Sequence, residues 1–318
     1  MSASLTLFYS ILFYFILTYS FLFIFQALKL ETLLLLRQTL ESHPPKVLQP
    51  FLSRLLPLVI RSVNEDWFRV IAESLRVLAA FIVVARPYVN DDNENNNNEN
   101  YNNNENNNNN NNDNNYDYRP LVLPIYNALL PRLEALDIDQ EIKDCSIVTV
   151  GKLFAHFGDE IKEKLPAVLS LLKKRLENEN TRTQTLKSIS IIAKSKLNLN
   201  LSFLLLSSTN ELSLFLRQKS RSLKQTTLLT LDSLINSKSA ILETDDINTI
   251  LHETSTLIND NDLHLTFLAL NLTLSIIQLT KENSIIVVKS YIYPKMIELA
   301  SSPLLQGERR KEKKREVK

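Results

Sequence analysis

The sequence predicts an all-α fold in which helix pairs follow one another as an α-solenoid. Three observations lead to this prediction. Apolar residues recur at helical spacing through most of the 318 residues, short polar turns interrupt them, and the pattern returns after about 40 residues. Because one helix pair cannot bury its apolar face until the next pair stacks on it, this period is typical of HEAT or armadillo repeats.

The clearest helix pair spans Leu121–Leu136 and Gln140–Phe157. Leu129, Leu133 and Leu136 share one face of the first helix at helical spacing. Asp139 ends the short turn, where its carboxylate can accept hydrogen bonds from the free amides of the second helix. We therefore expect two antiparallel helices with Asp139 as the N-cap.

The same pair of helices recurs at four other places, 47–63 with 67–84, 161–176 with 182–194, 203–216 with 221–235, and 247–258 with 264–279. Pro57, Pro131 and Pro166 fall inside the expected first helices. Proline removes one helical hydrogen bond and bends the axis, so a bend shared by first helices favours HEAT repeats.

An asparagine-rich insertion, residues 90–118, interrupts the repeats. From Asn90 to Asn115 most residues are asparagine, and the remainder are acidic residues and Tyr101. A tract without aliphatic side chains cannot offset the entropy of ordering, so we expect a disordered loop. Without it, the step from Asp66 to Asp139 matches the period of the other repeats.

The two ends differ in composition from the repeats. Residues 1–27 are apolar, and Leu5–Phe25 is long enough to cross the roughly 30 Å hydrocarbon layer. We interpret this segment as a transmembrane helix, a buried helix or a gene-model artefact; a missing basic region argues against a signal peptide. Residues 307–318 form a basic tail, either a solvated end or a localisation or phosphate-binding signal.

The counts of rare residues exclude several kinds of site. Three glycines are too few for GxGxxG or GxxxxGK[ST] phosphate loops. One cysteine and four scattered histidines leave no disulfide and no zinc set, and Cys145 falls on the apolar face of its helix as a core residue. We therefore expect no enzyme activity, cofactor, metal or small-molecule substrate. The net charge of +1 does not favour direct nucleic-acid binding.

The candidate binding residues are cations on the second helices. They lie in the first two turns of three successive second helices: Lys143, Arg182, Lys187, Arg221 and Lys224. Matched positions in neighbouring repeats form rows across a solenoid, so this cation ladder suits an acidic protein partner. Ordinary solvated helix faces are the alternative interpretation.

Several sequence words resemble a known family. They include EDWFRVIAESLRV (Glu65–Val77), LDIDQEIKDCSI (Leu136–Ile147) and SSPLLQG (Ser301–Gly307). These words are similar to consecutive HEAT repeats in the middle of the cullin-associated neddylation-dissociated proteins, also described as TATA-binding-protein-interacting. The resemblance covers about residues 28–307 apart from the insertion. We therefore expect HEAT repeats at 28–89 and 119–306.

The resemblance implies a non-enzymatic scaffold that regulates the assembly of SCF and other cullin–RING ubiquitin ligases. Such a scaffold binds an unneddylated cullin in the ligase core and releases substrate adaptors. It implies a cytoplasmic and nuclear location, with a membrane location only if the N-terminal apolar segment is genuine. The alternative is a generic HEAT-repeat interaction scaffold, tethered to a membrane or free.

Overall fold

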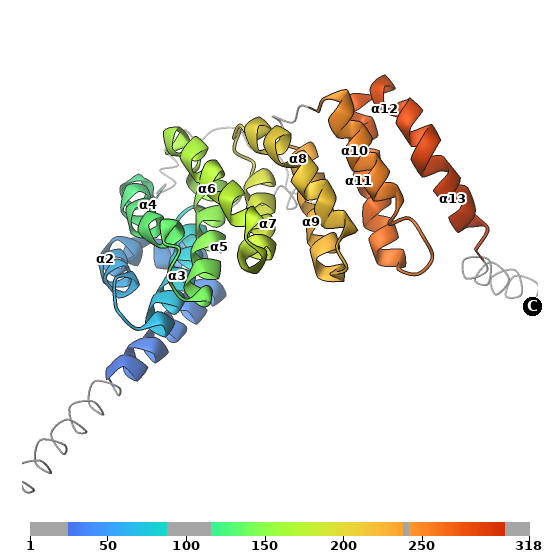
Figure 1. Cartoon of the computed structure of the whole chain (residues 1–318). Helices are drawn as coiled ribbons and strands as arrows, with labels where there is room; N and C mark the ends of the chain where they lie inside the picture. The colour runs from blue at the N-terminus through green and yellow to red at the C-terminus, as the bar shows by residue number, and fades with distance from the viewer. Residues whose placement is uncertain (1–24, 88–115, 238–241, 303–318) are drawn as a thin grey trace, which may run out of the picture. The chain divides into compact units, whose positions relative to one another are not determined.

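The computed structural model describes residues 25–87, 116–237 and 242–302. These ranges contain α-helices with short 3-10 and π segments and no strand, which confirms the predicted all-α class (Figure 1). Residues 90–115 of the insertion, most of the Leu5–Phe25 segment and the basic tail lie outside the described ranges. The chain divides into two units, Met1–Glu160 and Ile161–Lys318.

Unit 1 contains a helix over residues 25–42 followed by two helix pairs. The pairs are α2 (Pro45–Val63) with α3 (Phe68–Ala85), and α4 (Arg119–Glu134) with α5 (Gln140–Phe157). The first helices α2 and α4 contact each other, as do the second helices α3 and α5. The core lies between these two layers and includes fully buried Leu52, Leu75, Phe81, Ile125 and Phe154.

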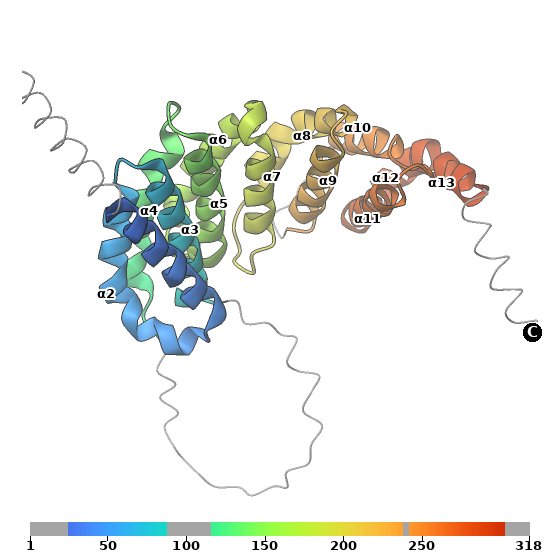
Figure 2. The same cartoon turned by 90° about the horizontal axis from the view of Figure 1, so that it is seen from below.

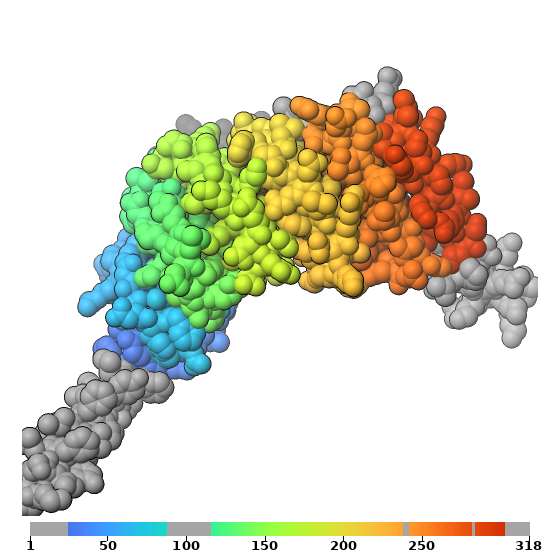
Figure 3. Space-filling model, in the orientation of Figure 1, coloured from blue at the N-terminus to red at the C-terminus, as the bar shows by residue number. Residues whose placement is uncertain are grey.

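Unit 2 repeats this two-layer arrangement. A 3-10 turn η2 (Lys162–Lys164) leads into the pairs α6 (Leu165–Glu177) with α7 (Glu179–Ala193), α8 (Ser202–Arg217) with α9 (Arg221–Ile235), and α10 (Thr244–Ser255) with α11 (Leu263–Thr280). The last segment is α12 (Glu282–Val287), the π-helix η3 (Val288–Ile292) and α13 (Tyr293–Ala300). First helices α6, α8, α10 and α12 form one layer and second helices α7, α9 and α11 the other (Figure 2). Side chains of successive pairs fill the space between the ribbons (Figure 3).

Side-chain caps fix where the second helices α5, α7, α9 and α11 begin. Each cap oxygen accepts a hydrogen bond from a backbone N–H two or three residues later. The caps are Asp139 (2.8 Å), Asn178 (2.9 Å), Ser220 (3.3 Å) and Asp262 (3.1 Å). The cap satisfies one of the amides that has no partner within the helix. The prediction of Asp139 as an N-cap is confirmed.

Two details of the predicted pairs are wrong. Helix α4 ends at Glu134, so Leu136 lies in the following turn with 77% of its surface exposed. Pro166 lies in the first turn of α6, where an N–H would have no helical partner, so it bends nothing. Pro57 and Pro131 do lie inside α2 and α4, as predicted.

A network of hydrogen bonds around one buried carboxylate joins three helices of unit 1. Glu73 of α3, only 3% exposed, accepts hydrogen bonds from Arg37 Nε of the 25–42 helix at 2.6 Å and from Arg76 Nη1 at 3.1 Å. Arg76 Nη2 also donates to Glu141 of α5 at 2.5 Å. Because an unpaired buried charge is costly, this network favours one register between neighbouring second helices.

We expect Glu73→Gln to lower the free energy of unfolding by about 1–3 kcal/mol, since both arginines lose a charged acceptor. Urea unfolding measures the change. The matched control is Glu298→Gln, which removes an exposed pair with Lys295 on α13 and should cost less than about 1 kcal/mol. Equal losses in the two variants would contradict a special role for the buried network.

The structure describes residues 116–118, the last three residues of the expected loop, and Tyr118 packs beside the end of α5, so these three residues do not belong to a disordered loop as predicted. Arg86, on the other side of residues 88–115, meets Tyr118 there. The guanidinium of Arg86 lies 5.0 Å from the ring centroid of Tyr118, and Tyr118 stacks on Phe157 with centroids 5.2 Å apart. Arg86 Nη1 also donates to Asp159 Oδ1 at 2.5 Å and to the His156 carbonyl at 2.8 Å. These contacts hold together the chain segments on either side of residues 88–115.

Deleting residues 90–115 should therefore change the free energy of unfolding by no more than about 1 kcal/mol, because loop-closure entropy changes slowly with length. Chemical unfolding of the shortened and the complete chain provides the comparison. As a control, Arg86→Ala in the complete chain should be the more damaging change. Loss of cooperative unfolding on deletion would show that the insertion supports the fold.

Candidate partner-binding surface

The candidate surface is the outward side of the second-helix layer of unit 2, formed by α7, α9 and α11 and called here the second-helix face. The inward sides of these helices are fully buried at Leu186, Leu231 and Leu272. Helix α9 contacts both α7 and α11. The three helices therefore present their outward side chains next to one another.

The structure places the five predicted cations on three helices. Lys143 lies on α5 of unit 1, and the other four lie on α7 and α9 of unit 2. Counted from the N-caps, Lys143, Arg182 and Lys224 occupy the same position in their helices, one turn after the cap. In unit 2 the matched pair of Arg182 and Lys224 lies on helices that contact each other.

Arg182 is used inside the protein. Its Nε donates to the Leu176 carbonyl at 3.0 Å and its Nη2 to the Glu177 carbonyl at 3.2 Å, so it satisfies the last carbonyls of α6. The guanidinium carbon also lies 4.4 Å from the ring centroid of Phe215 in α8. Arg182 therefore joins two repeats, and its charge is directed into the protein.

Arg221 is likewise paired within the protein. Its Nε and Nη2 donate to the two carboxylate oxygens of Asp262 at 2.5 and 3.1 Å, linking the first turns of α9 and α11. The hydrogen bond from Arg221 lowers the pKa of Asp262 to about 2. A forked pair of this kind fixes both side chains in one geometry. Asp262 thus caps α11 and holds α9 beside it.

Lys187 and Lys224 remain available to a partner. Lys187 is exposed on α7 and Lys224 half-buried on α9. Within the described ranges, neither ammonium group forms an ion pair or a hydrogen bond. These two lysines therefore supply the free positive charge of the second-helix face, in contrast to the two arginines of the ladder.

Three apolar side chains complete the face, and sequence reasoning missed them. Leu229 of α9 is 37% exposed, and Phe267 and Leu274 of α11 are 59% and 53% exposed. Hydrogen bonds from Ser275 to Asp232 at 2.6 Å and from Arg221 to Asp262 fix the register, which places Leu229 opposite the stretch between Phe267 and Leu274. The face is therefore basic on α7 and α9 and apolar on α11.

Helix α11 is apolar almost all round, which explains why its outward residues escaped the sequence analysis. Among the described residues it is the helix that is long and apolar enough to cross a membrane, with 39% of it buried. Core helices of water-soluble proteins meet the same criterion of length and composition. In the structure α11 packs against α9, α10 and α12, and its outward side, with Phe267 and Leu274, is exposed.

The residues considered for chemistry are engaged in packing. No cluster of His, Cys, Asp or Glu in the described ranges could hold a metal ion. Cys145 is 9% exposed, and burial raises the pKa of its thiol to about 11. His156 is buried, its Nδ1 lies 2.6 Å from the Arg86 carbonyl, and burial lowers its pKa. Cys145 is therefore a core residue, as predicted.

The raised pKa makes Cys145 a poor nucleophile at neutral pH, because the thiolate is the reactive form. We expect iodoacetamide to leave the folded chain unlabelled near pH 8 and to label it fully after denaturation. Mass spectrometry gives an unambiguous readout, since Cys145 is the single cysteine of the sequence. Rapid labelling of the folded chain at this pH would contradict the buried neutral thiol.

Comparison with known proteins gives the family resemblance. A family model described as "CAND1-like, TPR repeats" matches residues 25–150. Cullin-associated NEDD8-dissociated protein 1 of Arabidopsis thaliana is 36% identical over 283 residues, covering 88% of this chain. The resemblance seen in the sequence is confirmed. The Dictyostelium discoideum protein of the same name is 32% identical over 282 residues, again covering 88% of this chain.

This chain spans about a fifth of the length of these relatives, since the matches cover 21% of each. The mouse protein named Cullin-associated NEDD8-dissociated protein 2 is similar, with 31% identity over 87% of this chain. The resemblance therefore applies to about a fifth of each relative.

Solved structures with a similar fold include designed armadillo repeat proteins. A designed armadillo repeat protein, YIII(Dq)4CqI, superposes with a TM-score of 0.52 over 78% of this chain and 93% of its own, at 15% identity. An engineered protein superposes with a TM-score of 0.55 over 86% of this chain and 64% of its own, at 13% identity. At such low identity the likeness shows the fold alone. It confirms the predicted HEAT- or armadillo-like solenoid.

Proposed function

We propose that this chain acts as a non-enzymatic scaffold that binds an unneddylated cullin of a cullin–RING ubiquitin ligase core through the second-helix face. The observation that carries the proposal is the arrangement of free lysines on α7 and α9 beside exposed apolar residues on α11. Such a face suits a protein surface that offers carboxylates next to an apolar patch. The names of the relatives, which are cullin-associated, support a cullin as that partner.

The apolar and the charged residues have different roles in this proposal. Phe267, flanked by Leu229 and Leu274, provides the apolar centre, where aromatic side chains contribute most to affinity. Lys187 and Lys224 lie on the neighbouring helices and attract an acidic partner, which raises the association rate more than the affinity. Arg182 and Arg221 act indirectly, because their bonds hold neighbouring helices in register.

In the proposed mechanism, binding of the scaffold to a cullin weakens the binding of substrate adaptors to the same cullin, and the adaptors are released. If the scaffold and an adaptor disfavour each other on one cullin, the scaffold weakens adaptor binding and the adaptor weakens scaffold binding by the same factor. No bond is made or broken in such an exchange, so it requires no nucleophile, metal or cofactor. In this way the scaffold regulates the assembly of SCF and other cullin–RING ligases. We place this activity in the cytoplasm and the nucleus.

The test is binding of the complete chain to a purified cullin–RING core, with and without its ubiquitin-like modifier, by surface plasmon resonance. We expect capture of the unmodified form and weaker capture of the modified form. Phe267→Ala should weaken binding by about tenfold, as loss of a central aromatic residue does. Lys187→Glu with Lys224→Glu should slow association several-fold, less so at high salt.

The matched control for the charge change is Lys289→Glu, because Lys289 is exposed on η3, outside the second-helix face. It should leave the association rate unchanged. Equal capture of modified and unmodified cores, or indifference to the changes at Phe267 and the two lysines, would overturn the proposal. Capture of an unrelated partner through the same face would support the generic scaffold instead.

A further inference from the structure

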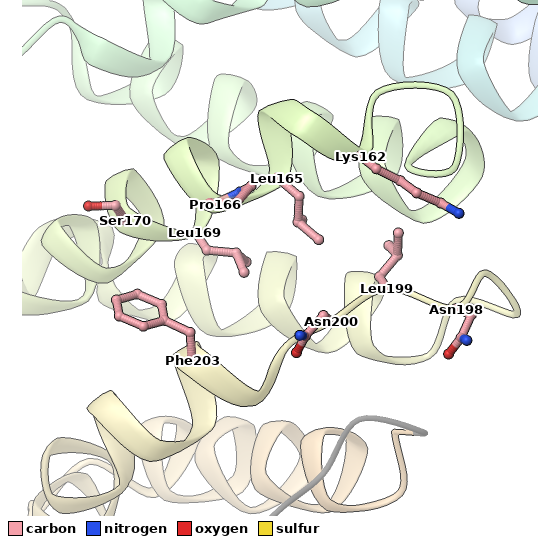
Figure 4. Close-up of a pocket in the computed structure, with 9 residues that line it drawn as sticks. All are labelled: Lys162, Leu165, Pro166, Leu169, Ser170, Asn198, Leu199, Asn200 and Phe203. Carbon is pink, nitrogen blue, oxygen red and sulfur yellow. The ribbon is translucent and has the colours of Figure 1, made fainter.

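A separate hollow lies on the first-helix layer of unit 2. It has a volume of about 390 Å³ and opens between the start of α6 and the loop that leads into α8 (Figure 4). Leu165 and Leu169 of α6 approach Leu199 of the loop, and the ring of Phe203 closes one end. This volume falls within the range of about 300–1,000 Å³ that is usual for ligand-binding pockets.

The hollow is formed in advance by contacts within the protein. Leu165 and Leu199 are each 5% exposed, and Leu169 is 2% exposed, so the floor is fixed in the core. The loop is held by Asn200, whose Oδ1 accepts hydrogen bonds from Ser202 N at 3.1 Å and Ser202 Oγ at 2.6 Å. A preformed site loses little conformational entropy when it is filled.

One wall of the hollow is exposed and apolar. Phe203 is 56% exposed, whereas phenylalanine side chains are usually buried in folded proteins. Leu206, on the next turn of α8, is 40% exposed and continues the apolar surface away from the hollow. A bulky side chain of a bound ligand in the hollow would bury the ring of Phe203. The neighbouring residues of that ligand would lie against Leu206.

The rim of the hollow is polar and its charge is positive. The nine described residues that line it include Lys162 and no carboxylate. Because Asn200 Oδ1 is occupied, the amide Nδ2 of Asn200 remains as a donor at the rim. The surrounding helix pair, residues 161–200, carries six Lys against three Glu once buried Arg175, inward-directed Arg182 and Lys187 of the second-helix face are left aside. This positive excess favours an acidic ligand.

From the hollow, its exposed aromatic wall and the basic helix pair around it, we infer that this site binds an acidic peptide segment through one bulky apolar side chain. The apolar side chain fills the space between Leu169, Leu199 and Phe203. Carboxylates on either side of it face Lys162 and the donor group of Asn200. The site lies on the first-helix layer, so it is a second docking point, independent of the second-helix face.

The test is fluorescence anisotropy of the complete chain with a fluorescein-labelled peptide that carries one phenylalanine between runs of glutamate. We expect saturable binding that is lost when alanine replaces the phenylalanine of the peptide. In the protein, Phe203→Ala should weaken binding by about tenfold, because the peptide ring loses its apolar contact. Lys162→Glu should weaken binding several-fold, with a smaller effect at high salt.

Two exposed positions outside the hollow provide matched controls. Leu214→Ala removes an apolar side chain that is 51% exposed on the same helix as Phe203, and Lys289→Glu reverses an exposed charge on η3, outside the helix pair 161–200. Both should leave peptide affinity unchanged, and thermal melts of all variants establish that they fold. Absence of saturable binding, equal binding of a glutamine-flanked peptide, or equal losses in Phe203→Ala and Leu214→Ala would overturn the inference.

Discussion

Burial of apolar side chains between successive helix pairs holds each unit together, because a single pair leaves part of its apolar surface uncovered. In unit 2, α9 contacts α7 on one side and α11 on the other, and α8 likewise contacts α6 and α10. Polar bonds then select the register of this stacking. Arg217 of α8, for example, forms a forked pair with buried Glu253 of α10, which lowers the pKa of Glu253.

Because apolar burial and polar bonds between helix pairs maintain the fold, the outward sides of the helices are free to bind partners. Inward positions are fixed by packing, so most of them are apolar, and Cys145 is one such core residue. Buried polar side chains such as Thr181 and Thr230 form hydrogen bonds within the protein. Outward positions are not constrained in this way, and two surfaces of unit 2 combine exposed apolar side chains with positive charge. The second-helix face combines free lysines with Phe267, and the hollow of the first-helix layer combines Lys162 with Phe203. Both combinations suit acidic protein surfaces.

The helix pairs could be predicted from the sequence because their signals are local. Apolar spacing and polar turns predicted the bounds of α5 and α9. The position of Asp139 directly before α5 predicted it as the N-cap of that helix. Contacts between repeats could not be predicted in the same way. Arg221 meets Asp262 and Arg182 meets Phe215 only after neighbouring helices stack, so their charges were assigned to a partner. Phe267 was missed because α11 is apolar on nearly every side, which hides its outward face.

Hydrogen–deuterium exchange of the complete chain, with and without an unmodified cullin–RING core, tests the central claim most directly. If the second-helix face is the binding surface, the partner slows exchange in α7, α9 and α11, while α6, α8 and α10 exchange as in the free chain. Protection is then strongest around Phe267 in α11. Protection confined to the first-helix layer, or no protection in unit 2 under conditions that saturate binding, would contradict the account.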